Sequence, residues 1–142
     1  MSYVRMLLGA IAFFASSFVI QGLLGFALGG EYFASIPAMR EEPLVHLAMF
    51  ATLIMGIGFS MLYPLTAFRG GPVVRGVKYG LLVGLIVVPF LALDIAGRFD
   101  IPSVGTWIVI QGALGMLHFV TAGMLVGLIF REKTGLPPSK GT

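Results

Sequence analysis

The sequence predicts an all-α membrane protein, folded as a four-transmembrane-helix bundle. Of its 142 residues, 58% are hydrophobic and 11% are charged, whereas soluble domains are about 25% charged. The apolar residues form four stretches, each long enough for the roughly 20 residues that a helix needs to cross a bilayer. We expect the helices at residues 4–28, 44–65, 79–96 and 104–130. They form a single membrane domain (1–130), which a flexible cytoplasmic tail (131–142) follows.

Each predicted helix has its own signal in the sequence. The stretch 4–28 exceeds the apolar core of about 7–15 residues in a secretory signal, so we expect it to be retained. Acidic residues and Pro43 favour a helix start before 44–65. A Gly-Gly-Pro turn precedes the third stretch, and Pro89 within it is expected to kink that helix. The fourth stretch, 104–130, is predominantly apolar and glycine-rich.

Basic residues are unequally distributed between the two sides of the membrane in this topology. With the N-terminus inside, Arg40 and Arg98 are the outer basic residues, and the other seven of the nine lie inside. Positive residues favour the cytoplasmic side, so both termini are expected to be cytoplasmic (N-in/C-in), as in a bacterial inner membrane protein. The basic balance thus indicates topology, and no nucleic-acid partner is expected.

Three cations of the predicted second loop, Arg69, Arg75 and Lys78, lie beside the inner headgroups. Contacts with anionic lipid would contribute about 1 kcal/mol per cation. The alternative is that these residues are solvated and only set the topology. Aromatic residues are placed at the two interfaces, with Tyr63 and Tyr79 at the inner one and Tyr32 and Trp107 at the outer one.

Small residues recur at the spacing of packed membrane helices. Gly80 and Gly84 form one G-x-x-x-G pair, and Gly123 and Gly127 form another. Such pairs let two helix backbones approach closely. They predict packing within the chain, self-association, or packing against other membrane subunits, in addition to contact with the lipid bilayer.

Five polar residues fall within or near the apolar spans: Gln21, His46, Asp94, Gln111 and His118. At 1.5 Å per residue, His46 and Asp94 lie within about 5 Å of the outer boundary, the two glutamines lie at about 10 Å, and His118 lies at about 20 Å. If their faces point inward, they form an outer funnel that narrows towards His118. Such a cluster serves either interhelical hydrogen bonding or ligand binding.

One phrase is repeated in the chain. VIQGLLG at residues 19–25 returns as VIQGALG at residues 109–115. Because the two helices run in opposite directions, their glutamines fall at similar depths, and we expect Gln21 and Gln111 to form a helix clasp. Chance in a chain of few residue types and a ligand clamp are the alternatives.

The sequence requires no cofactor, and the lack of cysteine excludes thiolate metal sites. No metal site is expected at His46 and Asp94 either, since an interfacial pair or separate solvation is favoured for them. One haem held by both histidines is disfavoured, since His46 and His118 differ in depth by roughly 16 Å. Ligation of a haem or pigment by His118 alone stays open. The hydrolase and nucleotide-binding motifs G-x-S-x-G and G-x-x-x-x-G-K are absent, so we expect no enzyme.

The segment LYPLTAFRGGPVVRGVKYGLLVGL (62–85), with AGMLVGLIFR (122–131), resembles a loosely defined group of small uncharacterised bacterial four-helix integral membrane proteins. The shared features are a Tyr-Pro end to the second helix, a Gly-Gly-Pro turn and glycine-rich third and fourth helices. The resemblance implies a bacterial four-helix membrane fold and carries no activity. The chain departs from the group where Arg75 and Lys78 make the second loop wholly basic.

These observations predict a non-catalytic accessory or assembly subunit that packs in a larger membrane complex. Short loops, glycine-rich helix faces and the lack of a catalytic constellation favour that interpretation. The alternative is a binder of a lipophilic ligand or cofactor (quinone, haem or pigment) or a small oligomeric transporter, with the polar funnel around His118 as its site.

Overall fold

The computed structural model describes residues 2–37, 40, 42 and 44–131, and every regular element in that part of the chain is helical. The first span is one continuous helix, Tyr3–Ala34. It consists of α1 (Tyr3–Ser17), a π-helical segment η1 (Phe18–Leu24) and α2 (Gly25–Ala34). The other elements are α3 (Val45–Leu62) with the 3₁₀ turn η2 (Tyr63–Leu65), α4 (Pro72–Arg98) and α5 (Val104–Ile129). Within the described residues, four helices are therefore long and apolar enough to cross a membrane.

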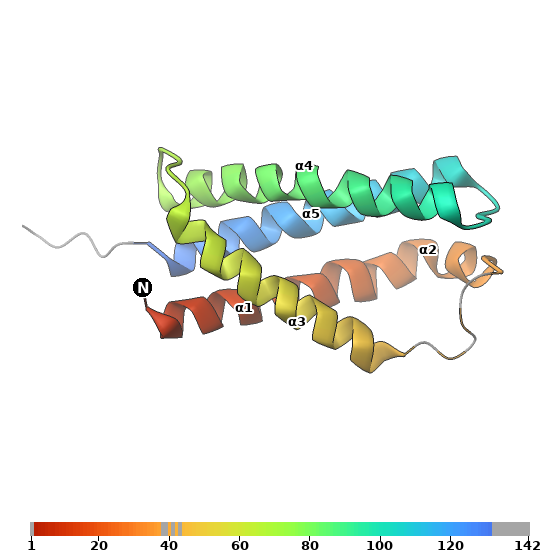
Figure 1. The fold of residues 1–142 in the computed structure, drawn as a ribbon, viewed down its shortest axis with the longest axis horizontal. Coiled ribbons are helices and arrows are strands. Elements are labelled where there is room, and N and C mark those ends of the chain that lie inside the picture. The colour runs from red at the N-terminus through yellow and green to blue at the C-terminus, as the bar shows by residue number, and fades with distance from the viewer. Residues whose placement is uncertain (1, 38–39, 41, 43, 132–142) are drawn as a thin grey trace, which may run out of the picture.

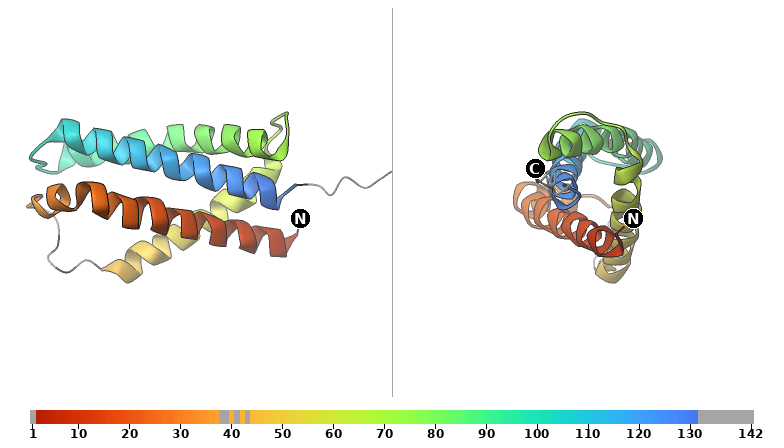
Figure 2. Two further views of the ribbon diagram at one scale, coloured as in Figure 1. Left: turned by 180° about the vertical axis from the view of Figure 1, so that it is seen from behind. Right: turned by 90° about the vertical axis from the view of Figure 1, so that its left-hand side faces the viewer.

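The helices form a bundle in which α3 is set apart (Figures 1 and 2). The first helix, α4 and α5 run side by side, and α3 crosses α1 obliquely, so that its first residues lie away from the other helices. The N-terminus and the end of α5 lie at the same end of the bundle (Figure 1). The predicted all-α architecture with four apolar spans is confirmed.

Two helices extend beyond their predicted bounds. The first continues past residue 28 to Ala34, because Gly29 and Gly30 do not break it; Gly29 instead faces the Ile110 side chain of α5. α4 begins at Pro72 rather than at residue 79, since proline fits the first turn of a helix directly after the turn at Gly70, whose φ is +122°. Arg75 and Lys78 consequently lie on a helix rather than in a loop.

Backbone contact between α4 and α5 is the tightest packing in the bundle. A Cβ atom added to Gly76 would overlap the backbone of Gly123, and one added to Gly80 would overlap the backbone of Phe119. A Cβ atom on Gly127 would overlap the carbonyl of Pro72. The glycine pairing expected from the sequence therefore starts one turn earlier, at Gly76, because α4 itself starts earlier.

Aromatic side chains fill the space between these helices and α1 and α3. The ring of Phe59 lies 4.9 Å from that of Phe13 and 4.5 Å from that of Tyr79, measured between centroids. Tyr79 is 1% exposed, and its hydroxyl donates to the carbonyl of Phe59 at 2.6 Å. Trp107 is also buried, and its indole N–H donates to the carbonyl of Ala92 at 2.9 Å.

The prediction that Tyr79 and Trp107 anchor the bundle at the lipid interface was therefore wrong. Each ring has its polar atom satisfied by a backbone carbonyl of a neighbouring helix, so it needs no contact with water or headgroups. Tyr63 is buried as well, whereas Tyr32 is half-buried and donates to the carbonyl of Ser103 at 2.8 Å.

A test of the backbone contact uses two glycines of α5. Gly123→Ala is expected to lower the free energy of unfolding by about 1–3 kcal/mol, because the new methyl group meets backbone atoms that cannot move aside. Gly112→Ala is the matched control, since a Cβ there meets nothing within 4 Å. Unfolding in mixed detergent micelles measures both variants. Equal stability of the two would contradict the assigned contact.

Candidate functional site

His118 on α5 is the centre of the buried polar residues. Its side chain is 2% exposed. The imidazole lies edge-on to the Phe13 ring with centroids 4.5 Å apart, and it lies 5.2 Å from the ring of its neighbour Phe119. The histidine is thus enclosed by the aromatic core rather than open to a channel.

Both imidazole nitrogens have partners on the first helix. Nε2 lies 3.2 Å from the carbonyl oxygen of Phe13, and Nδ1 lies 3.3 Å from Nε2 of Gln21. A carbonyl oxygen only accepts, so the proton of the neutral ring belongs on Nε2, and Nδ1 accepts from the Gln21 amide. This group, the Gln21–His118–Phe13 clasp, ties α1 and η1 to α5.

The clasp leaves His118 without a free nitrogen for another ligand. Axial ligation of a haem or pigment uses an imidazole nitrogen, so it would require one of the two contacts to break. The carbonyl of Phe13 also accepts from the hydroxyl of Ser16 at 2.9 Å, which adds a second polar contact at the same point. The geometry therefore favours the interhelical role over the ligand-binding role for His118.

Gln21 pairs with a residue two helical turns deeper than the sequence suggested. Its expected partner was Gln111, on the assumption that the first helix ended at residue 28. The six further residues 29–34 lengthen that helix by about 9 Å at 1.5 Å per residue, which moves Gln21 from the level of Gln111 to that of His118. Among the described residues, no hydrogen bond joins the two glutamines; both line a cavity of about 170 Å³ with Phe33 and Leu114.

His46 and Asp94 do not join this group. His46 lies on the part of α3 that points away from the bundle, and it borders an apolar groove of about 470 Å³ lined by Ile11, Phe14, Met49, Phe50 and Leu53. The carboxylate of Asp94 pairs with Arg98 at 2.8 Å, one turn along α4. The predicted five-residue funnel is therefore divided among separate places, because α3 crosses the bundle obliquely instead of closing it.

The described residues contain no cluster of three or more His, Asp or Glu side chains placed to hold a metal ion.

The three cations predicted to contact lipid headgroups do not all lie together in the structure. Arg69 and Lys78 are exposed, and the Lys78 ammonium donates to the carbonyl of Arg69 at 3.2 Å. Arg75 instead lines a pocket that also contains Arg5 and Tyr63, two residues that sequence reasoning had used only for topology and interfacial anchoring.

The clasp predicts a coupling energy that a double-mutant cycle measures. Gln21→Leu and His118→Leu, alone and combined, should show a coupling of about 0.6 kcal/mol, with about 1.7 kcal/mol as the upper bound for hydrogen bonds between membrane helices. Gln111→Leu is the control, and its effect should add to that of His118→Leu. Additivity of the Gln21 and His118 variants would show that the contact contributes nothing.

Comparison with known proteins identifies no relative. No protein family, curated protein or solved structure matches the chain. The resemblance of residues 62–85 to the four-helix group stays a prediction, and the roles assigned to side chains rest on their geometry.

Proposed function

We propose that the protein is a non-catalytic subunit of a membrane complex, which packs against a helix of another membrane protein. The observation that carries this proposal is the position of α3, whose first half leaves the bundle (Figure 1). Residues 44–51 are all exposed on that half, from Leu44 through Ala51.

A stripe of small residues continues along α3 from its packed half into its free half. In the packed half, Gly56 contacts the carbonyl of Ala10, and Ser60 lies against Gly9. One and two turns earlier, Thr52 and Ala48 continue the same i, i+4 row, which turns by about 40° around the helix at each step. The Thr52 hydroxyl donates to the Ala48 carbonyl at 2.8 Å, so its polar group is satisfied within the helix. Small residues let helix backbones meet closely in lipid, where apolar area alone gives little drive to associate.

The buried polar residues support the same proposal. The clasp consumes both nitrogens of His118, so its contacts serve the bundle itself. The alternative function is a binder of a quinone, haem or pigment, or an oligomeric transporter. The apolar groove beside His46 suits such a ligand better than the enclosed site at His118 does. Contact of that groove with a ligand is therefore the second candidate.

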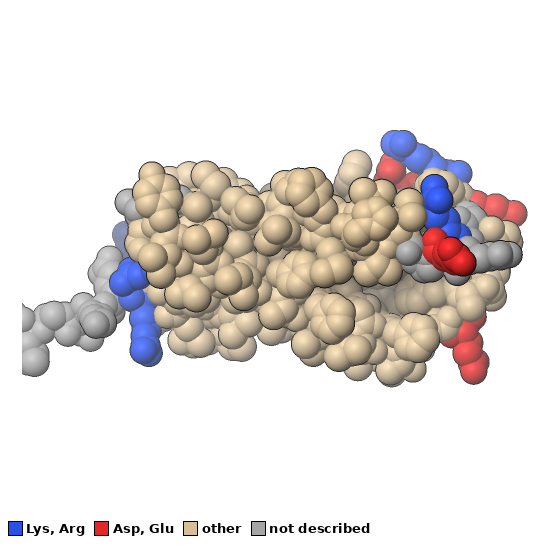
Figure 3. All heavy atoms as spheres, turned by 90° about the horizontal axis from the view of Figure 1, so that it is seen from below, with Lys and Arg blue, Asp and Glu red and all other residues tan. Residues whose placement is uncertain are grey.

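The proposed setting is a bacterial inner membrane with both termini in the cytoplasm. On the face shown in Figure 3, charged atoms lie at the two ends of the molecule and the middle carries none. The end that bears the termini shows Lys and Arg only, whereas the opposite end shows both signs. Positive residues on the cytoplasmic side support this orientation.

Crosslinking from two matched phenylalanines tests the proposal. Phe50 on α3 is 64% exposed and Phe90 on α4 is 65% exposed, so both can carry a photoreactive phenylalanine without disturbing the core. In native membranes, the probe at Phe50 is expected to give one defined adduct with an integral membrane protein, and the probe at Phe90 is expected to give lipid adducts. A small-molecule adduct at Phe50 would favour the groove ligand instead, and identical adducts at both positions would contradict both.

Ala48→Leu gives a second test, on affinity. The larger side chain should block close approach to the free half of the stripe and weaken recovery of the crosslinked partner about tenfold. Ala113→Leu, at an exposed position on α5, is the control. Equal recovery with both variants, measured by quantitative co-purification, would contradict docking at this stripe.

A further inference from the structure

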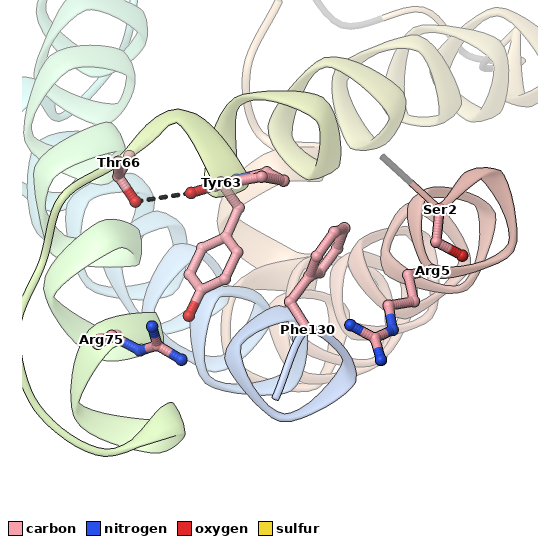
Figure 4. A pocket seen from close by; sticks show the side chains of 7 residues that line it. Ser2, Arg5, Tyr63, Thr66, Arg75 and Phe130 are labelled. Atoms are coloured by element: carbon pink, nitrogen blue, oxygen red, sulfur yellow. Dashed lines mark hydrogen bonds between the residues drawn. The ribbon is translucent and has the colours of Figure 1, made fainter. Parts of the chain in front are cut away.

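A pocket of about 260 Å³ opens at the end of the bundle that bears the termini (Figure 4). Four elements meet there: α1 and α4 begin beside it, and η2 and the end of α5 close it. It is lined by Ser2, Arg5, Tyr63, Pro64, Thr66, Arg75 and Phe130, which include two cations and no acid. The pocket is larger than the roughly 30 Å³ that one water occupies in the liquid, so it accommodates a group of several atoms.

Two buried polar atoms in this pocket have no partner among the described residues. One is the hydroxyl oxygen of Tyr63, whose side chain is 6% exposed, and the other is Nε of Arg75. Figure 4 shows the Tyr63 hydroxyl and the Arg75 guanidinium pointing towards each other. Arginine only donates, so the hydroxyl proton of Tyr63 needs an acceptor from elsewhere. The Nε–H of Arg75 has no acceptor among the described residues either. Buried donors of this kind are nearly always paired in proteins.

The helix ends beside the pocket have the charge of an anion site. Neither α1 nor α4 has an acidic residue in its first turn, and neither has a side-chain N-cap hydrogen bond. Each instead carries an arginine near its start, Arg5 in α1 and Arg75 in α4. A cation at the positive end of a helix dipole is unfavourable, whereas an anion there is favourable. A negatively charged acceptor would interact favourably with both helix N-termini. It would also accept hydrogen bonds from the unpaired donors.

We infer that this pocket binds a phosphoryl group. Arg75 and the Tyr63 hydroxyl would donate to its oxygens, and Arg5 would supply a second positive charge from the other side of Phe130 (Figure 4). Guanidinium groups match the geometry of phosphate oxygens. The pocket lies at the end of the membrane spans, at the depth of lipid headgroups, so the phosphate of an anionic phospholipid and free phosphate are the two sources of this group. The inference does not depend on the proposed docking of α3.

Thermal stabilisation of the whole chain in neutral detergent, at fixed ionic strength, tests the pocket. Phosphatidylglycerol is one probe and inorganic phosphate is the other, with phosphatidylcholine as the reference lipid. A ligand that binds only the folded protein raises its apparent stability. We expect phosphatidylglycerol to stabilise the wild type more than the reference lipid does. Stabilisation by inorganic phosphate alone would support the phosphoryl site and assign it to the free anion.

Three variants distinguish a built pocket from general surface charge. Arg75→Gln should weaken binding about tenfold or more, and Tyr63→Phe about fivefold, since each loses a donor to the anion. Arg69→Gln removes the same charge at an exposed position and should change affinity little. Tyr63→Phe removes only an unpaired hydroxyl, so it keeps the test valid if Arg75→Gln does not fold.

Two results would overturn the inference. One is equal loss of binding in Arg69→Gln and Arg75→Gln with no effect of Tyr63→Phe, which would indicate unspecific attraction to a basic surface. The other is failure of both probes to stabilise the wild type.

Discussion

The contact between the backbones of α4 and α5 determines the arrangement of the remaining helices. In lipid, apolar side chains gain little by leaving the solvent, so close van der Waals contact must hold the helices together. Gly76, Gly80 and Gly123 provide it, because no Cβ atom keeps the two backbones apart. The resulting pair presents one continuous surface, and Phe119 and His118 project from it towards α1.

The first helix is attached to this pair by a different kind of interaction. Phe13 packs against Phe119 with centroids 5.6 Å apart, and its carbonyl receives the His118 N–H. A hydrogen bond between membrane helices is worth little, about 0.6 kcal/mol on average, but its geometry is specific. Polar groups thus select one register of α1 on α5, while the aromatic core supplies most of the contact area. α3 receives only part of this stabilisation, since residues 44–51 at its start are all exposed.

The fold could be predicted from the sequence because length and hydropathy decide it, and residue types alone give both. The site could not, because side-chain pairing depends on where each helix ends. Ending the first helix at residue 28 misplaced Gln21 by about 9 Å along the helix axis. For this reason Gln21 was expected to pair with Gln111 instead of His118. Placing the start of the third helix at residue 79 likewise hid Gly76 and turned Arg75 into a loop residue. The oblique course of α3 has no sequence signal, so His46 was assigned to a cluster that it does not reach.

The π-helical segment η1 has a consequence for the angular phase of the first helix. Phe13 and Gly25 both face α5, yet they are twelve residues apart, and at about 100° per residue an uninterrupted α-helix would leave them about 120° out of phase. The wider turn of a π-helix takes up one extra residue, which reduces the mismatch to about 20°. The segment therefore acts as a phase correction between two halves of one helix. The π-helical turn and the extra residue therefore depend on each other. The same residues wound as a regular α-helix would leave only one half facing α5, whereas a single deletion within Phe18–Leu24 would restore the phase without the π turn.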